Sequence, residues 1–437
     1  MTIRKLSDCL ELVIDRRGVT PKKLNSDWSD DGYRVLSANN IKTTGLINCE
    51  TIRKIDEETY RKWMKDEIQR GDILLTSEAP AGEVFYWDSD EKIVCGQRVF
   101  VLRTKPDVYP LYLKYYLQSS VAQNEIRNKC SGSTVFGISV KMFDSIKVDI
   151  PDDYETQKKV ADYLYSIDNK IDLNNQINFE LDSLAKTVYD YWFLQFEFPN
   201  EEGKPYKSSG GKMVWNDELK REIPEGWYLE KLINLVSDEK NSIVDGPFGT
   251  QLKVNEYTDD GVPVYEMYQL NNNFIMDANI SHFISNKKYL EVKRSSVKNG
   301  DIIISKTGTL GLLGIVNSKR YEKGIIVSRL AKITPDENKI GKYGLLIYLK
   351  KLTDSNYWLN KSGGSTMPIL NNSILEDVPL VYSKSGVFNK FEYYIAPIFE
   401  KIFNIQQQNQ QLESLRDFLL PLLMNGQVTF KKDDENA

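Results

Sequence analysis

The chain of 437 residues repeats itself once, at a distance of about half its length. A repeat is the first feature to establish, because it fixes how many structural units a chain contains. Gly71-Asp-Ile-Leu-Leu-Thr76 returns 229 positions later as Gly300-Asp-Ile-Ile-Ile-Ser305. Two further pairs follow in the same order, 232 and 231 positions apart: Gly132-Ser-Thr134 with Gly364-Ser-Thr366, and Asn178–Leu184 with Asn409–Leu415. Three matches in one order indicate duplication, so each half is a mixed segment followed by a long helix.

The repeated helices are long and amphipathic. No glycine or proline interrupts the chain between Tyr154 and Leu194, and at 1.5 Å per residue this predicts a helix on the order of 60 Å long. Apolar residues with three- and four-residue spacing form a stripe on each helix, as in coiled coils. One small globule cannot bury so long a stripe, so we predict that the two helices pack antiparallel. The predicted contact residues are Leu164, Ile167, Ile171, Asn178, Leu181 and Val188 in the first helix and Ile395, Ile398, Ile402, Asn409, Leu412 and Leu419 in the second.

Two features of these helices leave alternatives open. Asn178 and Asn409 occupy equivalent places on the two stripes. Either they are buried, where asparagine lowers stability but fixes the register of the helices, or both face solvent. The first helix ends in an aromatic group that either packs on the following domain or contacts another subunit: Tyr189, Tyr191, Trp192 and Phe193.

The mixed segments ahead of the helices are rich in β-branched and aromatic residues and in turn signals. This pattern predicts short strands of a globular α+β domain in each half. The expected strands include Ile73–Leu75, Val84–Trp87, Val99–Leu102, Val262–Tyr265, Ile302–Ile304, Ile325–Val327 and Leu330–Ile333. Shorter helices are expected at Glu57–Lys65, Pro110–Arg127 and Tyr343–Leu359. The stretch Pro199–Ile223, with few apolar residues, is typical of a linker.

Composition excludes several classes of protein. No apolar run approaches the length that spans a bilayer, and Met1–Leu12 lacks the apolar block of a secretory signal. A cytoplasmic protein with reduced thiols is expected, because no two of the four cysteines have CxxC spacing. The net charge of −5 does not exclude DNA binding, since 57 basic side chains can still form a local basic face. His282 is the one histidine; we interpret it as an ordinary strand residue within Ile280–Ile284.

Several motifs stand in a specific order along the chain. Ile223-Pro-Glu-Gly-Trp-Tyr-Leu-Glu-Lys-Leu232 is followed by Asp245-Gly-Pro-Phe-Gly-Thr-Gln-Leu-Lys253 and by Gly261-Val-Pro263. Together with the duplicated Gly-Asp-Ile blocks and the two helices, this order resembles the DNA-sequence specificity subunit of type I restriction–modification enzymes. The resemblance covers essentially the whole chain. The first half departs from it, because it begins at Met1-Thr-Ile-Arg-Lys-Leu6 without the Pro-Glu-Gly-Trp element.

The resemblance implies an α+β fold in which two long antiparallel coiled-coil helices separate two globular target-recognition domains, with a pseudo-two-fold internal repeat. The implied boundaries are 1–153 for the first domain, 154–196 for the first helix, 197–222 for a linker, 223–386 for the second domain, 387–425 for the second helix and 426–437 for a tail. Each domain would read one half of an interrupted target in double-stranded DNA. The helices would set the spacing and dock two modification subunits, which methylate adenine, and restriction subunits would supply motor and nuclease. S-adenosylmethionine, ATP and Mg²⁺ are then expected in these partners, and no cofactor or metal in this chain.

Base recognition needs Arg, Lys, Asn, Gln, Ser or Thr on loops that face a groove. In the first domain we predict DNA contacts from Arg16, Arg17, Lys22, Lys23, Asn39, Asn40, Ser77, Gln97, Arg98, Ser133 and Thr134. In the second domain we predict them from Thr250, Gln251, Lys253, Gln269, Asn271, Lys306, Thr307, Arg329, Ser365 and Thr366. Nearby glycines either allow close approach to phosphate or form plain turns.

The motifs that catalysis would need are missing from the sequence. There is no Asn/Asp-Pro-Pro-aromatic motif of an amino-methyltransferase and no GxxxxGK[ST] motif of an ATPase. Glu218-Leu-Lys220 has a nuclease-like spacing but lies in the expected linker. These absences disfavour an enzyme that both recognises and modifies DNA. We interpret the chain as a non-catalytic specificity subunit; the alternative is a coiled-coil DNA-binding scaffold or regulator unrelated to restriction.

Overall fold

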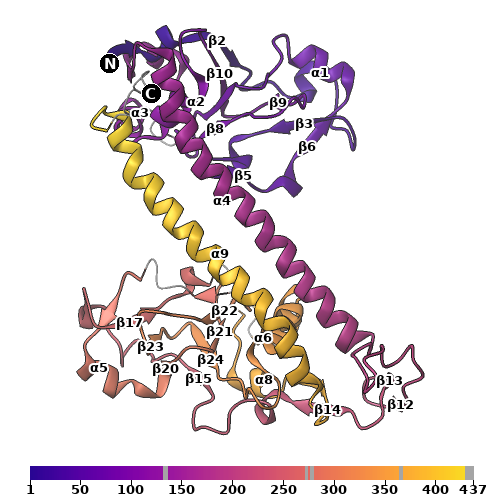
Figure 1. Cartoon of the computed structure of the whole chain (residues 1–437). Helices are drawn as coiled ribbons and strands as arrows, with labels where there is room; N and C mark the ends of the chain where they lie inside the picture. The colour runs from indigo at the N-terminus through magenta and orange to yellow at the C-terminus, as the bar shows by residue number, and fades with distance from the viewer. Residues whose placement is uncertain (131–135, 271–273, 276–279, 364–367, 429–437) are drawn as a thin grey trace, which may run out of the picture. The chain divides into compact units, whose positions relative to one another are not determined.

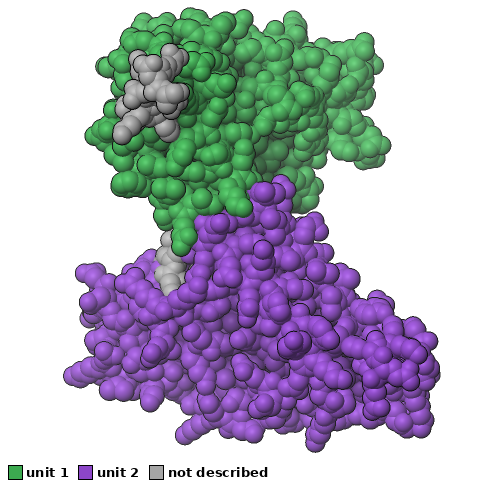
Figure 2. Space-filling model, in the orientation of Figure 1, with its two compact units in different colours: residues 1–172, 411–437 green, residues 173–410 purple. Residues whose placement is uncertain are grey.

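A computed structural model describes residues 1–130, 136–270, 274–275, 280–363 and 368–428. The chain divides into two compact units, residues 1–172 with 411–437 and residues 173–410 (Figure 2). Both long helices, α4 (Tyr154–Tyr189) and α9 (Val387–Met424), cross this division. Each unit therefore combines a mixed α/β domain with a stretch of both helices (Figure 1), which confirms the predicted α+β fold class.

The first unit is organised around a buried central strand. Its elements are β1 (Thr2–Lys5), β2 (Leu10–Asp15), β3 (Tyr33–Leu36), β4 (Ile41–Lys42), β5 (Gly45–Leu46), β6 (Arg53–Ile55), α1 (Glu57–Trp63), β7 (Ile73–Thr76), β8 (Val84–Tyr86), β9 (Val94–Cys95), β10 (Val99–Thr104), α2 (Pro110–Gln118), α3 (Ser120–Lys129) and β11 (Lys147–Ile150). An antiparallel sheet has the order β2-β10-β7-β8. Successive side chains of a strand point to opposite faces. Ile73 and Leu75 of β7 therefore pack with α2 and α3, whereas Leu74 packs in the core of the sheet β6-β3-β9.

The second unit follows the same plan with more strands. Its elements are β12 (Met213–Asn216), β13 (Arg221–Pro224), β14 (Tyr228–Lys231), β15 (Ile243–Asp245), β16 (Tyr257–Thr258), β17 (Val262–Tyr265), β18 (Phe274–Ile275), β19 (Phe283–Ile284), α5 (Asn286–Glu291), β20 (Ser296–Val297), β21 (Ile302–Ser305), β22 (Leu313–Val316), β23 (Gly324–Ile326), β24 (Leu330–Ile333), α6 (Lys342–Asp354), α7 (Tyr357–Lys361), α8 (Asn372–Glu376) and β25 (Pro379–Tyr382). Two five-stranded sheets have the orders β15-β24-β21-β22-β18 and β16-β19-β17-β23-β20.

The strand registers of the two units coincide. Val35 pairs with Val94 where β3 runs parallel to β9, and Val264 pairs with Ile325 where β17 runs parallel to β23. The central strands β7 and β21 pair with β10 and β24 in corresponding registers as well. The duplication inferred from three short sequence matches therefore extends through both sheets.

The repeated Gly-Asp places a buried carboxylate just before each central strand. Asp72 accepts a hydrogen bond from the backbone N–H three residues earlier and binds Arg103 through both oxygens, at 2.8 and 2.9 Å. Asp301 accepts the same backbone hydrogen bond and a second one from Thr334 Oγ1 at 2.7 Å. The motif thus serves the fold, since each carboxylate links the turn before the central strand to the neighbouring strand.

Within each unit, α4 and α9 pack against each other and run antiparallel. In the first unit Arg416 of α9 donates to Asp168 of α4 at 3.1 Å, and Leu164 shares a core with Leu423, further along α9. In the second unit the ring of Tyr189, at the end of α4, meets that of Phe391 near the start of α9. Of the predicted contact residues, Leu164, Ile167, Ile171, Ile395, Ile402 and Asn409 are buried, and Asn178, Leu181, Val188, Ile398, Leu412 and Leu419 are half-buried.

The polar contact between the helices involves Asn174 rather than Asn178. The Nδ2 of buried Asn174 donates to Asn409 Oδ1 at 2.7 Å, and Asn409 Nδ2 donates to Asn175 Oδ1 at 2.8 Å. In an antiparallel pair, two equivalent residues of a duplication face each other only at the centre. Asn178 lies beyond that point, and its buried Oδ1 has no hydrogen-bond partner among the described residues.

The stretch after α4 belongs to the core of the second unit. The helix ends in a π-helical turn, Asp190–Leu194, and the expected linker contains the antiparallel hairpin β12–β13. The ring of Phe193 packs against Phe388 and Trp227. The aromatic end of α4 thus packs within its own chain; Tyr191 is partly exposed, and the buried members are Tyr189, Trp192 and Phe193.

Two expected single helices are each broken in two. At Ser119 the chain leaves α2, and the Ser119 hydroxyl accepts from Ala122 N–H to begin α3. Asn356 has a left-handed backbone (φ 57°) and separates α6 from α7. A capping hydroxyl and a left-handed residue each end a helix. No helix among the described residues has the length and apolar character needed to cross a membrane.

Candidate nucleic-acid interface

A hollow of about 520 Å³ opens in the first unit beside the sheet β6-β3-β9. Its walls include the indole rings of Trp28 and Trp63, and its exposed margin carries Lys22, Asn39 and Gln97. These last three residues were predicted from the sequence to contact DNA. Their side-chain polar groups have no hydrogen-bond or ionic partner among the described residues. The fold therefore gathers unpaired amides and an ammonium group around an aromatic cavity.

A cation lies over one of these aromatic rings. The guanidinium of Arg53, from β6, stands 3.8 Å from the ring centroid of Trp28, a cation–π distance. Arg53 is exposed and lines the same hollow. Neither residue was predicted to contact DNA, because their 25-residue separation gives no sign that they meet.

The corresponding place in the second unit is built from different side chains. The counterparts of Trp28, Ser37, Asn39 and Arg53, 229 positions later, are Tyr257, Glu266, Tyr268 and His282. The rings of Tyr257 and His282 stack with centroids 4.6 Å apart, and His282 Nδ1 lies 3.0 Å from Glu266 Oε2. The two units thus keep one backbone but present different polar groups, and His282 is a member of this group rather than an ordinary strand residue.

In each unit a basic side chain pairs with an aspartate at the end of a strand, Asp15 of β2 in the first unit and Asp245 of β15 in the second. In the first unit Arg17 binds Asp15 through two nitrogens, both at 2.8 Å, and Arg17 also lies over the ring of Phe100. Burial raises the pKa of Asp15, but the hydrogen bonds and charge of Arg17 outweigh it, so that the net pKa is below the usual value. The equivalent aspartate of the second unit, Asp245, binds Lys306.

The two cations come from different backbone positions. Arg17 follows β2, whereas Lys306 follows β21, where the first unit has Ser77. Both reach the segment beyond the Gly-Ser-Thr repeats: Arg17 donates to the carbonyl of Ile138 at 3.4 Å, and Lys306 donates to Asn372 Oδ1 at 3.1 Å. Lys306 is buried, so this predicted DNA contact holds its own loop together in the structure.

An arginine stands at the same place in both units. The carbonyls of Arg98 and Arg329 accept from the backbone N–H of Ser77 and Lys306, both at 2.8 Å. Both arginines are exposed. Arg98 has a left-handed backbone (φ 67°), and its side chain pairs with Glu78 at 2.9 Å.

The predicted contact residues differ widely in exposure. Exposed are Lys22, Lys23, Asn39, Gln97, Arg98, Thr250, Gln251, Lys253 and Arg329; half-buried are Arg16, Arg17, Gln269 and Thr307; buried are Asn40, Ser77 and Lys306. Ser133, Thr134, Asn271, Ser365 and Thr366 lie outside the described residues. Asn40 and Gln269 are equivalent, and the side chain of each accepts a hydrogen bond from the backbone three residues earlier, at 3.1 and 2.7 Å. These two side chains close turns after β3 and β17.

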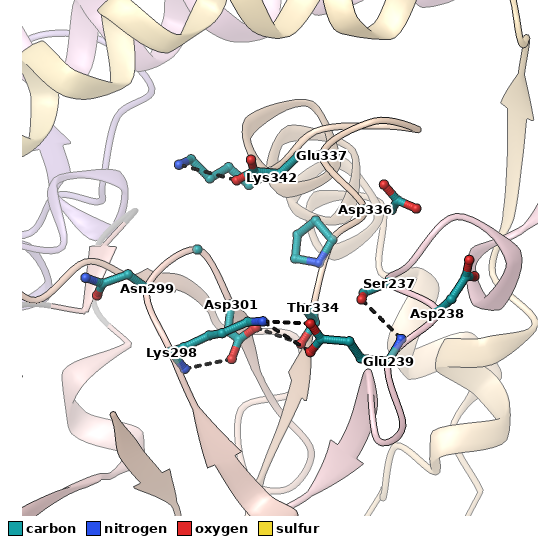
Figure 3. A pocket seen from close by; sticks show the side chains of 12 residues that line it. Ser237, Asp238, Glu239, Lys298, Asn299, Asp301, Thr334, Asp336, Glu337 and Lys342 are labelled. Atoms are coloured by element: carbon teal, nitrogen blue, oxygen red, sulfur yellow. Dashed lines mark hydrogen bonds and ion pairs between the residues drawn. The ribbon is translucent and has the colours of Figure 1, made fainter. Parts of the chain in front are cut away.

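A second hollow, of about 410 Å³, lies next to Asp301 in the second unit (Figure 3). Its charged side chains largely pair with one another: Lys298 with Glu239 at 3.1 Å, and Lys342 with Glu337 at 4.0 Å. Burial raises the pKa of Asp301. The described residues contain no group of three or more side chains able to hold a metal ion. We therefore assign this hollow to the ion pairs that support β21.

Comparisons with known proteins agree with this architecture. Residues 1–183 match the type I restriction modification DNA specificity domain. The chain is 26% identical over 428 residues to the type I restriction enzyme MjaIX specificity subunit of Methanocaldococcus jannaschii, covering 98% of this chain and 93% of the relative. It is 24% identical to the HindI specificity subunit of Haemophilus influenzae, covering 90% and 94%. The S subunit structure from M. genitalium shares the fold, with a TM-score of 0.58 and 16% identity over 99% of this chain and 96% of that one.

Proposed function

The chain belongs to the type I restriction–modification specificity subunits, and we propose that it reads a two-part, interrupted sequence in double-stranded DNA, one part with each unit. A specificity subunit is the non-catalytic component of its enzyme. The observation that carries the proposal is the repetition of one sheet register with different side chains at equivalent positions: Ser37, Asn39 and Arg53 in the first unit, and Glu266, Tyr268 and His282 in the second. Two readers with one backbone and different polar groups fit two different half-sites.

The duplicated long helices also suggest where partner subunits bind. Exposed apolar residues recur 231 positions apart on the long helices: Tyr163 with Tyr394, and Leu184 with Leu415. Exposed apolar groups at repeated positions support two equal docking places. We assign these to two modification subunits, which would carry S-adenosylmethionine and methylate adenine. Restriction subunits using ATP and Mg²⁺ would complete the assembly, which acts on cytoplasmic DNA.

A domain exchange tests the two-part reading. Residues 7–150 are replaced by the corresponding segment of another specificity subunit, and the methylated sequence is determined by methylome sequencing of a host with the modification subunits. We expect one half of the target to change and the other half to stay. The matched exchange of residues 233–382 should change the opposite half. A change of both halves in either exchange would contradict separate reading. As a further control, the purified single chain should neither methylate nor cleave DNA.

A further inference from the structure

We propose that the hollow of the first unit binds one unstacked nucleobase, with the DNA target as its source. The choice of source rests on the proposed function. The volume of about 520 Å³ lies in the range of small-ligand pockets. A base within a duplex presents only an edge in a groove, so a pocket that encloses a whole ring suits a base that has left the stack.

The walls offer the surface that a free base needs. Trp28 and Trp63 are both indoles, and bases stack on aromatic side chains without regard to sequence. Gly96, after β9, also lines the hollow, and a Cβ atom there would lie 3.2 Å from Val35 Cγ1; its counterpart in the second unit is Val327. Trp63 is buried and Trp28 is half-buried, so Trp28 offers most of the aromatic surface that a base could reach.

The polar margin offers the groups that would select and hold a nucleotide. The amides of Asn39 and Gln97 each carry donors and an acceptor, the combination that pairs with a base edge. Lys22 and Arg53 supply cations for the attached phosphate. The amides and the ammonium have no partner among the described residues. Groups left unpaired around one cavity are free to bind a ligand.

In the second unit the position equivalent to Arg53 on Trp28 is occupied by a side-chain ring. There His282 stacks on Tyr257 and contacts Glu266. In the first unit Arg53, the counterpart of His282, takes the same place on Trp28, so a guanidinium and not a ring covers that face of the indole. The inference is therefore specific to the first unit, where Asn39 stands at the position that Tyr268 occupies in the second.

Fluorescence of 2-aminopurine tests the DNA source. The full-length chain, without partners that act on bases, binds duplexes in which 2-aminopurine replaces each position of the first half-site in turn. We expect a several-fold rise in fluorescence at one position. Trp28→Ala and Asn39→Tyr should abolish the rise per bound duplex, with the amount of bound duplex measured separately by anisotropy. Trp215→Ala, on the exposed β12–β13 hairpin, is the control and should leave the rise intact. A rise that neither first-unit variant affects would overturn the assignment to this hollow.

Free nucleotides provide an independent test. Saturation-transfer NMR with dAMP, dGMP, dCMP and dTMP detects binding to the full-length chain, and Asn39→Tyr should remove any signal. If free nucleotides bind and no 2-aminopurine position responds, the hollow is a nucleobase pocket whose ligand is a free nucleotide rather than a base of the DNA target. Absence of both signals would overturn the inference. If instead no duplex is bound specifically, the proposed function fails, and the free-nucleotide result still decides the pocket.

Discussion

Asn174 of α4 and Asn409 of α9 are joined by a hydrogen bond of 2.7 Å, and both side chains are buried between the helices. Removing Asn409 leaves Asn174 Nδ2 with Gln408 Oε1 as its remaining acceptor, at 2.8 Å, so the loss is that of the hydrogen bonds to Asn409, about 0.5–1.5 kcal/mol each. We therefore expect Asn409→Leu to lower the free energy of unfolding, and Asn174→Leu with Asn409→Leu to recover most of the loss. Urea unfolding measures both. Asn178→Leu is the control and should not destabilise, because Asn178 Oδ1 has no partner to lose. A double variant less stable than the single one would contradict this account.

The two aspartate–cation pairs should differ in strength. The Lys306 side chain is 8% exposed and that of Asp245 is 24% exposed, so Lys306→Met leaves a largely buried carboxylate without its cation, at a cost of about 2–3 kcal/mol. Arg17 and Asp15 are each 31% exposed, so Arg17→Met should cost about 1 kcal/mol or less. Hydrogen exchange reports each unit separately, and faster exchange is expected mainly in the second unit of Lys306→Met. Lys306→Arg, which keeps the charge, is the matched control. Equal effects of the two Met variants would show that burial does not set the difference.

Features with a local signal were predictable from the sequence, and features that need distant contacts were not. The long helices follow from spacing within Tyr154–Leu194, and the repeat follows from direct comparison. By contrast, the ring of Trp28 meets Arg53 only because β3 and β6 bring the segments together. In the sequence Lys306 is indistinguishable from an exposed DNA contact, although in the structure it is buried and paired with Asp245. The duplication held one usable signal: aligning the halves at 229 positions would have paired Arg53 with His282 and marked both.

Asp168 gives the first unit a pH dependence. Burial raises its pKa, but Lys114, Tyr115 and Arg416 outweigh this, so the folded-state pKa lies below the usual 3.8. A carboxyl with a lowered folded-state pKa stabilises the fold above its unfolded pKa, and this contribution disappears as the pH falls through the folded value. We expect wild-type stability to fall below about pH 4 more steeply than that of Asp168→Asn, which should be less stable at pH 7.

Asp301 supplies the opposite case for the same experiment. Burial raises its pKa, so its ionised form disfavours folding above the raised value, and protonation relieves this cost as the pH falls. Ionised Asp301 lowers the free energy of unfolding, whereas ionised Asp168 raises it. Asp301→Asn should therefore change the pH dependence of the unfolding free energy in the opposite direction to Asp168→Asn. Urea unfolding at a series of pH values measures both. Parallel pH profiles for the two variants would contradict the assigned directions.

Paired substitutions on the helices test the docking places. Tyr163 and Leu415 lie in the first unit, and Leu184 and Tyr394 in the second, and each is at least 41% exposed. We expect Tyr163→Ala with Leu415→Ala to reduce the bound modification subunits from two to one, and Leu184→Ala with Tyr394→Ala to do the same. Mass photometry counts the copies. Trp215→Ala, an exposed residue of the β12–β13 hairpin, is the control and should retain two. Two bound copies in both double variants would place the docking surface elsewhere.

Lengthening α4 and α9 together tests whether the helices set the gap between half-sites. Four inserted residues add about one turn, or about 6 Å of helix. Along B-DNA this corresponds to about two base pairs at 3.4 Å each. Because the heptad pattern must continue through the insertion, the added residues should repeat the preceding apolar spacing in both helices. Methylome sequencing should then find both half-sites unchanged and the gap between them longer by about two base pairs. Insertion in α4 alone is the control: it puts the two apolar stripes out of register and should weaken methylation at every site. An unchanged gap in the double insertion, with methylation retained, would mean that something other than helix length determines the spacing.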